Sequence, residues 1–155
     1  MAFITFRPAT ALDAPDLLQW KNDPVTRKFS IATHDEITES QHAAWMTAML
    51  ADPNRRTYII EYDGHPCGDV RIEVHAEHVE IAVKLDQHFR GRGIGSKAIR
   101  TVGNIVQQEM KKRLIAKIVY GNVASMRLFE SCGYRVYSHG EGYYICSKDY
   151  IPTSE

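Results

Sequence analysis

The segment from Arg90 to Ser96 holds three glycines and two arginines within seven residues. Its glycines, at positions 91, 93 and 95, permit positive φ angles and let a ligand approach the backbone closely. A stretch of alternating apolar residues precedes the segment, and apolar residues at helical spacing follow it. Its backbone N–H groups are therefore expected at the N-terminus of a helix, where the dipole is positive. A diphosphate is the ligand that such a loop suits, with Arg90 and Arg92 adding full charges.

The two common nucleotide-binding motifs do not fit this loop. A dinucleotide-binding fold requires G-x-G-x-x-G, and its last position is occupied here by Ser96. A P-loop requires a second glycine followed by Lys and Ser or Thr, where this chain has Ser96-Lys97-Ala98. The glycines alone leave two interpretations open, an anion site of another kind or a tight strand-to-helix turn with incidental charge.

The charge of the chain is unevenly distributed. Residues 84–113 contain eight basic and two acidic residues, whereas the remainder contains 11 basic and 17 acidic ones. The formal net charge is nevertheless zero, which argues against a uniformly basic nucleic-acid-binding protein. A concentrated positive segment in a neutral chain favours local binding of an anion.

Length and composition predict one globular domain over residues 1–155. The three cysteines (Cys67, Cys132 and Cys146) form no C-x-x-C pair, and the seven histidines show no ligand spacing, so no metal site is expected. No apolar run approaches 18 residues, and the N-terminus lacks the apolar core of a signal peptide. We therefore expect a cytoplasmic protein without membrane association.

The elements that must position the loop follow from apolar periodicity. A first strand over 3–7 precedes a helix ending near Trp20, and Thr38 with Gln41 forms a capping box that opens a second helix. Asn22-Asp23-Pro24 is expected to form a turn, and the Asp63-Gly64 turn joins two strands of a meander. The order predicts an α/β (α+β) fold, a mixed, mostly antiparallel six- to seven-stranded sheet flanked by about four helices. The remaining elements are expected as strands over 57–62, 70–74, 79–85, 114–119, 134–137 and 143–146, and as helices after Asn122 and over 94–113, with three basic residues in the last turn of the latter.

Three segments together resemble one enzyme family. Arg90-x-x-Gly93-x-Gly95 is similar to the Q/R-x-x-G-x-G/A motif of the GCN5-related N-acetyltransferase (GNAT) superfamily, which binds the pyrophosphate of acetyl-coenzyme A. Residues 80–83 (Glu-Ile-Ala-Val) resemble the fourth strand of that family, and residues 122–134 resemble its N-x-x-S/A-x-x-x-[YF]-x-x-x-G-[FY] segment. The three segments occur in the family's order, within residues 57–146.

The resemblance implies direct attack of an amine on the acetyl thioester, with acetyl-CoA as cosubstrate and no metal. It implies a backbone N–H near Val83 as the donor to the oxyanion. It also makes Glu80 the first candidate for the general base, although Glu80 as an exposed strand residue paired with Arg71 remains an alternative. The contacts with the coenzyme are expected from Val83, Arg90, Gly91, Arg92, Gly93, Ile94, Gly95, Ser96, Asn122 and Ser125.

One position departs from the family pattern. Phe129 stands where the family usually has a tyrosine that acts as general acid, and a phenyl ring has no proton to give. A thiol has a pKa of about 8.5, so the leaving thiolate needs little help near neutral pH. Tyr120, Tyr143, Tyr144 or water remain alternatives for this role.

The N-terminal third is expected to line the acceptor site, because the opening helices cover it in this superfamily. The segment Trp20-Lys-Asn22-x-x-x-x-Arg27 is similar to a W-[RK]-N-x-x-x-[VI]-R stretch of acetyltransferases acting on nucleotide-linked amino sugars, such as those of pseudaminic acid biosynthesis. With His42 and Trp45, it predicts a small-molecule amine as acceptor, preferably a UDP-linked 4-amino sugar.

Several alternatives for the acceptor side stay open. They are a protein N-terminal α-amine as acceptor, a catalytically silent acyl-CoA-binding module, and purely structural roles for Trp20, Arg27 and Trp45. A homodimer is expected only from the habits of the family.

Overall fold

A computed structural model describes residues 2–32 and 34–152 and places seven strands in one sheet of order β1-β2-β3-β4-β5-β7-β6. All neighbouring strands run antiparallel except β4 and β5, which are parallel. The mixed, mostly antiparallel α/β fold is therefore confirmed. The strands are β1 Ile4–Pro8, β2 Arg55–Tyr62, β3 His65–Val74, β4 His78–Leu85, β5 Arg113–Val119, β6 Arg135–His139 and β7 Tyr143–Lys148.

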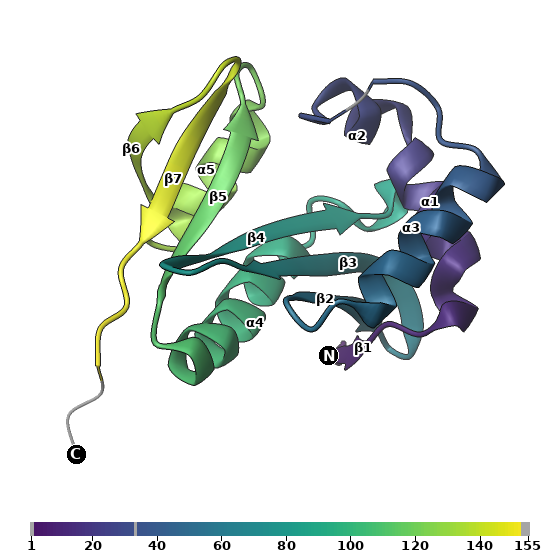
Figure 1. Cartoon of the computed structure of the whole chain (residues 1–155), viewed down its shortest axis with the longest axis horizontal. Helices are drawn as coiled ribbons and strands as arrows, with labels where there is room; N and C mark the ends of the chain where they lie inside the picture. Colours follow the sequence, from purple (N-terminus) through teal and green to yellow (C-terminus); the bar gives the residue numbers. More distant parts are fainter. Residues whose placement is uncertain (1, 33, 153–155) are drawn as a thin grey trace.

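Helices cover both faces of this sheet. Figure 1 shows α1 and α3 lying over the part formed by β2 and β3, with α4 on the other side and α5 beside β5 and β7. No helix in the described ranges is long and apolar enough to cross a membrane. The α-helices are α1 Ala14–Asn22, α2 Pro24–Lys28, α3 Glu39–Ala51, α4 Ile94–Met110 and α5 Val123–Ser131, with short 3₁₀ turns η1 Ala11–Asp13 and η2 Gln87–Phe89.

The described ranges contain five α-helices rather than about four, because α2 forms where turn chemistry alone was expected. Pro24 occupies its first turn, and the carboxylate of Asp23 accepts a hydrogen bond from the N–H of Thr26. The predicted capping box of α3 is confirmed, since Thr38 and Gln41 exchange side-chain-to-backbone hydrogen bonds of 3.2 and 2.9 Å.

The two faces of the sheet pack against different helices and form two separate hydrophobic clusters. One face packs an aliphatic core from β3 and β4, including Val70, Ile72 and Ile81, against α4. The opposite face packs Ile59 of β2 against a smaller cluster from α1 and α3 formed by Leu17, Trp20, Met46 and Met49. Toward β4 this second face becomes polar, because alternate residues of β3 and β4 there are charged.

The parallel strands β4 and β5 separate after a short pairing. Their register covers only His78 to Glu80 on β4, opposite Arg113 to Ile115 on β5. The strands then diverge, as Figure 1 shows, and residues 81–85 of β4 have no strand partner on that side. We call this opening the fork. It interrupts an otherwise continuous sheet, so backbone groups at its edge remain for a ligand to pair with.

Candidate active site

The open edge of β4 presents backbone groups to the fork. At the two ends of the strand, the N–H of Asp86 donates to the C=O of Cys67 (2.8 Å) and the C=O of His78 accepts from His75 (2.9 Å). The even-numbered residues of β4 thus direct their backbone N–H and C=O groups toward β3. Because these directions alternate along a strand, the N–H of Val83 points toward the fork. It therefore has the direction that the predicted oxyanion donor needs.

The glycine-rich loop forms the N-terminus of α4. Gly91 and Gly93 have φ angles of 77° and 78°, in the left-handed region that favours glycine. The first hydrogen bond of α4 runs from the N–H of Lys97 to the C=O of Gly93, and no side chain caps the helix. The N–H groups of residues 94–96 precede that bond, so they are available to an anion at a helix N-terminus.

The loop residues have different reasons for their identities. A Cβ atom on Gly91 or Gly93 would meet nothing within 4 Å, so these two positions require glycine for their backbone conformation and not for lack of space. A Cβ atom on Gly95, in contrast, would lie 3.1 Å from the side chain of Leu128 of α5. Gly95 therefore allows close packing of two helices. The side chain of Ile94 is fully buried, which leaves only its N–H for a ligand. The Oγ of Ser96 lies 3.8 Å from the Sγ of Cys132.

The loop arginines already have partners within the chain. Arg90 forms an ion pair of 3.0 Å with Asp23, which links the loop to α2. Arg92 stacks its guanidinium over the ring of Phe89 at 5.1 Å and donates to the C=O of His88 at 3.1 Å. Both guanidinium groups are thus held beside the loop, and the charge of Arg90 is partly neutralised by Asp23.

Across the fork, α5 begins with the predicted Asn122. Its Oδ1 accepts a 3.3 Å hydrogen bond from the N–H of Ser125, so Asn122 is a helix N-cap. Phe129 is only 3% exposed and packs edge-on against the ring of Tyr134, with centroids 5.0 Å apart. The position that usually supplies the general acid therefore belongs to the hydrophobic core here.

Glu80 lies at the fork on the charged face of the sheet. Its carboxylate pairs with the ammonium of Lys117 on β5 at 3.2 Å, and not with Arg71. Burial opposes the charged form of Lys117, but the charge and hydrogen bond of Glu80 outweigh it and raise the pKa of Lys117. The Nζ of Lys117 also lies 5.8 Å from the ring centroid of Tyr143 on β7. Three strands thus bring a carboxylate, an ammonium and a phenol near the fork.

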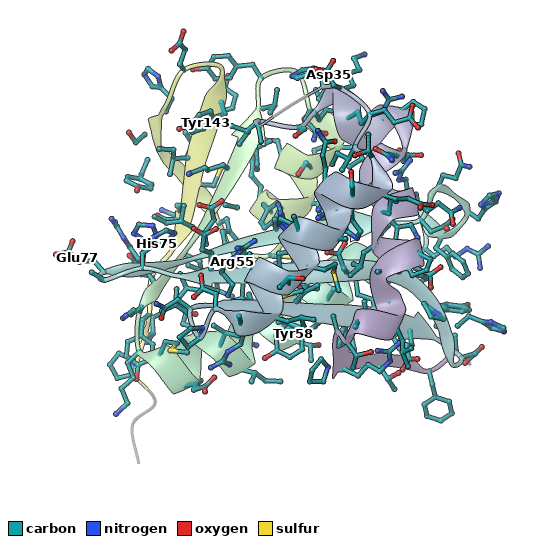
Figure 2. The ribbon with its side chains drawn as sticks, turned by 45° about the vertical axis from the view of Figure 1, so that its right-hand side comes forward. Asp35, Arg55, Tyr58, His75, Glu77 and Tyr143 are labelled. Carbon is teal, nitrogen blue, oxygen red and sulfur yellow. The ribbon has the colours of Figure 1, made fainter. Side chains whose placement is uncertain are left out.

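The tyrosines considered as proton donors separate into two groups. Tyr143 lies near Lys117, and Figure 2 shows it at the end of β7 that faces the α2 side of the molecule. Tyr120 and Tyr144 pack edge-on against each other at 4.7 Å and are largely exposed. Tyr143 is therefore the alternative that shares the surroundings of Glu80.

Three of the predicted acceptor residues have structural partners instead of an open site. Trp20 is 3% exposed, and its indole N–H donates to Asp86 at 3.2 Å. The side-chain amide of Asn22 exchanges two hydrogen bonds with the backbone of Ile37, at 2.7 and 2.8 Å. The Nε of Arg27 donates to the C=O of Asn22 at 3.1 Å. Trp20 and Asn22 therefore connect α1 to more distant segments, whereas Arg27 uses only its Nε in such a contact among the described residues.

His42 and Trp45 lie on α3, where their rings stack at 5.4 Å. His42 is buried, and burial together with the positive charge of Lys21 lowers its pKa. The half-buried Trp45 lines a pocket, and the Nζ of Lys21 lies 2.8 Å from the centroid of its ring. Of the five predicted acceptor residues, Trp45 is the one that lines this pocket.

The pocket lies between α3 and the charged face of β2, β3 and β4. Besides Trp45, its lining includes Arg55, Arg71 and Glu80, and Figure 2 shows Arg55 between α3 and the sheet. No motif in the sequence marks Arg55 as a site residue. The available signal was the alternation of residues 69–73, in which charged side chains at 69, 71 and 73 interrupt an apolar strand.

The buried charges next to this pocket were also not anticipated. Asp69 is 1% exposed, and neither carboxylate oxygen has a hydrogen-bond partner among the described residues. It lies directly opposite Lys84 in the β3–β4 register, and burial lowers the pKa of Lys84 to about 8. Within the described ranges, no three His, Cys, Asp or Glu side chains gather as a metal site.

Comparisons with known proteins agree with this geometry. Over 138 residues the chain is 25% identical to an uncharacterized protein of Methanocaldococcus jannaschii, covering 85% of this chain but only 28% of that protein. A crystal structure of a domain from the same organism superposes with a TM-score of 0.85 at 23% identity, covering 96% of this chain and 99% of that one.

Two more distant solved structures share the fold. Spermidine N-acetyltransferase from Vibrio cholerae, solved with CoA and spermine, has a TM-score of 0.81 at 13% identity, covering 93% of this chain and 92% of that one. The N-acetyltransferase PseH of Campylobacter jejuni has a TM-score of 0.71 at 11% identity, covering 94% and 97%. Residues 4–135 match the family model of the acetyltransferase (GNAT) domain. With its fork, its uncapped helix α4 and this match over most of its length, the chain belongs to the GNAT acetyltransferase family.

Proposed function

We propose that the chain transfers an acetyl group from acetyl-CoA to a primary amine. The observation that carries this proposal is the fork, where the unpaired edge of β4 lies next to the uncapped N-terminus of α4. The strand edge suits the amide groups of an extended pantetheine arm, and the N–H groups of residues 94–96 suit the pyrophosphate. The coenzyme supplies the acetyl thioester, and the protein positions and stabilises the reacting groups.

Each chemical need of this reaction has a candidate residue. The N–H of Val83 would donate to the oxyanion that develops on the thioester carbonyl. Glu80 would accept the amine proton, directly or through one water, as the new N–C bond forms and the C–S bond breaks. Tyr143 or water would return a proton to the departing sulfur. The ion pair with Lys117 would hold the carboxylate of Glu80 in place beside the fork.

The acceptor that we propose is a nucleotide-linked amino sugar, preferably a UDP-linked 4-amino sugar. The pocket beside Glu80 supports this choice, because it combines the aromatic surface of Trp45 with the positive charges of Arg55 and Arg71. A polycation such as spermine, which the Vibrio cholerae enzyme was solved with, would meet repulsion there. A protein N-terminal amine remains the alternative acceptor.

One observation favours a second candidate function. Phe129 offers no proton and is buried, so a module that binds acyl-CoA without transferring the acetyl group would tolerate it. In either case we propose a cytoplasmic location, where acetyl-CoA is supplied and the unpaired Cys67, Cys132 and Cys146 would stay reduced. The homodimer remains a prediction, which analytical ultracentrifugation would test.

A panel of amines tests these proposals together. Release of free coenzyme A is followed with acetyl-CoA and, in turn, a UDP-linked 4-amino sugar, a peptide with a free N-terminus and spermidine. Release with the amino sugar would support the preferred acceptor. Release only with the peptide would replace it by the alternative acceptor, and calorimetric binding of CoA without any transfer would support the silent module. Absence of CoA binding would refute the proposed function as a whole.

A further inference from the structure

Two arginines in the pocket next to Glu80 have no counter-ion. Arg55 on β2 and Arg71 on β3 both line the pocket, and within the described residues neither side chain forms a hydrogen bond or an ion pair. The Nε of Arg71 is completely enclosed without a partner. The guanidinium carbon of Arg55 lies 5.6 Å from the ring centroid of Trp45. The enclosed Nε itself is out of reach of a ligand, but the side chain of Arg71 is only half-buried and lines the pocket, so its terminal N–H groups can donate to an acceptor group there.

The carboxylates nearby do not neutralise this pair. Glu73, opposite Arg55 in the sheet register, pairs with His75 at 3.4 Å, and Glu80 pairs with Lys117 at 3.2 Å. Within the part of the chain that the structure describes, neither glutamate forms an ion pair with Arg55 or Arg71, so both guanidinium groups are available to an anion.

The remaining charged groups around the pocket are mostly positive. Asp69 is buried opposite Lys84, and Lys21 approaches from α1. Burial and the positive charges of Lys84, Arg71 and Arg55 lower the pKa of Lys21 to about 6, with Asp69 opposing. Lys21 is therefore mostly uncharged near neutral pH, and the positive charge that faces the pocket is that of the two arginines, Arg55 and Arg71.

We propose that Arg55 and Arg71 form a subsite for a phosphate group of the acceptor. This inference rests on the proposed acetyl transfer. It adds that the pocket selects amines that also carry a phosphate group. Two guanidinium groups offer forked N–H donors that match phosphate oxygens, which a single ammonium does not. Arg71 lies opposite Ala82, and Glu80 is two residues farther along the same face of β4. An acceptor whose phosphate is held by the two arginines would therefore extend its amine along the same face toward Glu80.

The subsite differs from the one that the sequence suggested. Arg27 belongs to the segment that was expected to line the acceptor site, but its Nε donates to the C=O of Asn22 and its side chain does not line this pocket. Arg55 and Arg71 become neighbours only through the pairing of β2 with β3, where Arg71 lies opposite Thr57 and Arg55 is two residues away. The pairing therefore builds an anion site from strands that show no phosphate motif.

A binding experiment without catalysis tests the subsite directly. UDP, which carries a diphosphate but no amine, is titrated calorimetrically into protein saturated with coenzyme A, so that the loop before α4 is already occupied. Arg55→Gln and Arg71→Gln should each weaken UDP binding about 10- to 100-fold, the range for losing hydrogen bonds to a charged group. The matched control is Arg135→Gln on the exposed strand β6, which should change the affinity less than twofold.

Two results would overturn the subsite. One is the absence of UDP binding to the coenzyme-saturated protein, and the other is binding that neither arginine substitution weakens. Coenzyme A affinity, measured on the same samples, shows whether each variant is folded. Should Arg71→Gln fail to fold, Arg71→Lys keeps the charge without the fork and should still weaken UDP binding.

A kinetic comparison separates this inference from the proposed function. Wild-type protein should acetylate an amino sugar 1-phosphate with a higher kcat/KM than the unphosphorylated sugar, and both arginine variants should lose this preference through KM. Equal kcat/KM for the two sugars would refute the subsite while leaving acetyl transfer intact. Loss of coenzyme A binding in the wild type would instead refute the proposed function.

Discussion

Replacement of Glu80 by Gln tests the proposed base most directly. The amide keeps the shape of the side chain but can no longer accept the amine proton, and general base catalysis typically contributes about 10²- to 10⁴-fold. We therefore expect kcat to fall by at least about 100-fold near pH 7. The loss should shrink as the pH rises above the pKa of the amine, because the acceptor is then already neutral.

The structure predicts that this substitution will hardly change stability. The side chains of Glu80 and Lys117 remain 24% and 35% exposed, and partly exposed pairs are usually worth less than about 1 kcal/mol. For a chain of this size that corresponds to a Tm change of about 2–4 °C. A large loss of activity with a small change in Tm would therefore reflect chemistry, not unfolding.

The assay is release of free coenzyme A from pH 6 to 10, alongside thermal unfolding. Glu73→Gln is the matched control, because Glu73 lies directly opposite Glu80 on the same face and pairs with His75 instead. The reasoning is refuted if Glu80→Gln lowers kcat less than about threefold, or if Glu73→Gln lowers it equally.

Three further predictions follow from the loop, the buried lysines and Trp20. Gly93→Ala, which forces a side chain onto a φ of 78°, should weaken coenzyme A binding about tenfold in calorimetry, whereas Gly64→Ala, equally strained at 83° in a distant turn, should not. The pKa values of Lys21 and Lys84 are about 6 and about 8, below the ordinary 10.5, so the unfolded chain binds more protons between pH 6 and 10.5. The free energy of unfolding should therefore rise with pH in this range, by up to about 1.4 kcal/mol per pH unit for each of the two lysines. Denaturant titrations of Lys21→Met should show a shallower rise of this free energy with pH. Trp20→Phe should cost about 1 kcal/mol through its lost hydrogen bond and leave the acceptor KM unchanged; a tenfold higher KM would contradict its core role.

Most of the fold was predictable because its signals are local. The Asp63-Gly64 turn, the capping box of Thr38 and Gln41, and the alternation along β4 each specify backbone conformation within a few residues. Helix α2 was missed for a related reason. Asp23-Pro24 suits both a turn and the start of a helix, and contacts such as the ion pair between Asp23 and Arg90 arise only in the folded chain.

The acceptor side was less predictable because aromatic residues have no single meaning in a sequence. Trp20 resembled part of a sugar-binding segment, but its side chain is buried and bonded to Asp86, 66 residues away. Glu80 was considered as a partner of Arg71, yet in the folded chain it pairs with Lys117 of β5. Both outcomes depend on contacts between distant segments, which periodicity does not report.

The sequence by itself determined the coenzyme side of this protein. A loop whose glycines adopt positive φ angles, followed by an amphipathic helix, needs only neighbouring residues to form its N–H cradle. The tertiary structure alone decided the pocket beside Glu80. The register of β2, β3 and β4 brings Arg55, Arg71 and Glu80 onto one face, and the separation of β4 from β5 leaves the backbone of Val83 without a strand partner on the side of the fork. Strand pairing joins residues far apart in the chain, so the acceptor site exists only once the sheet has formed.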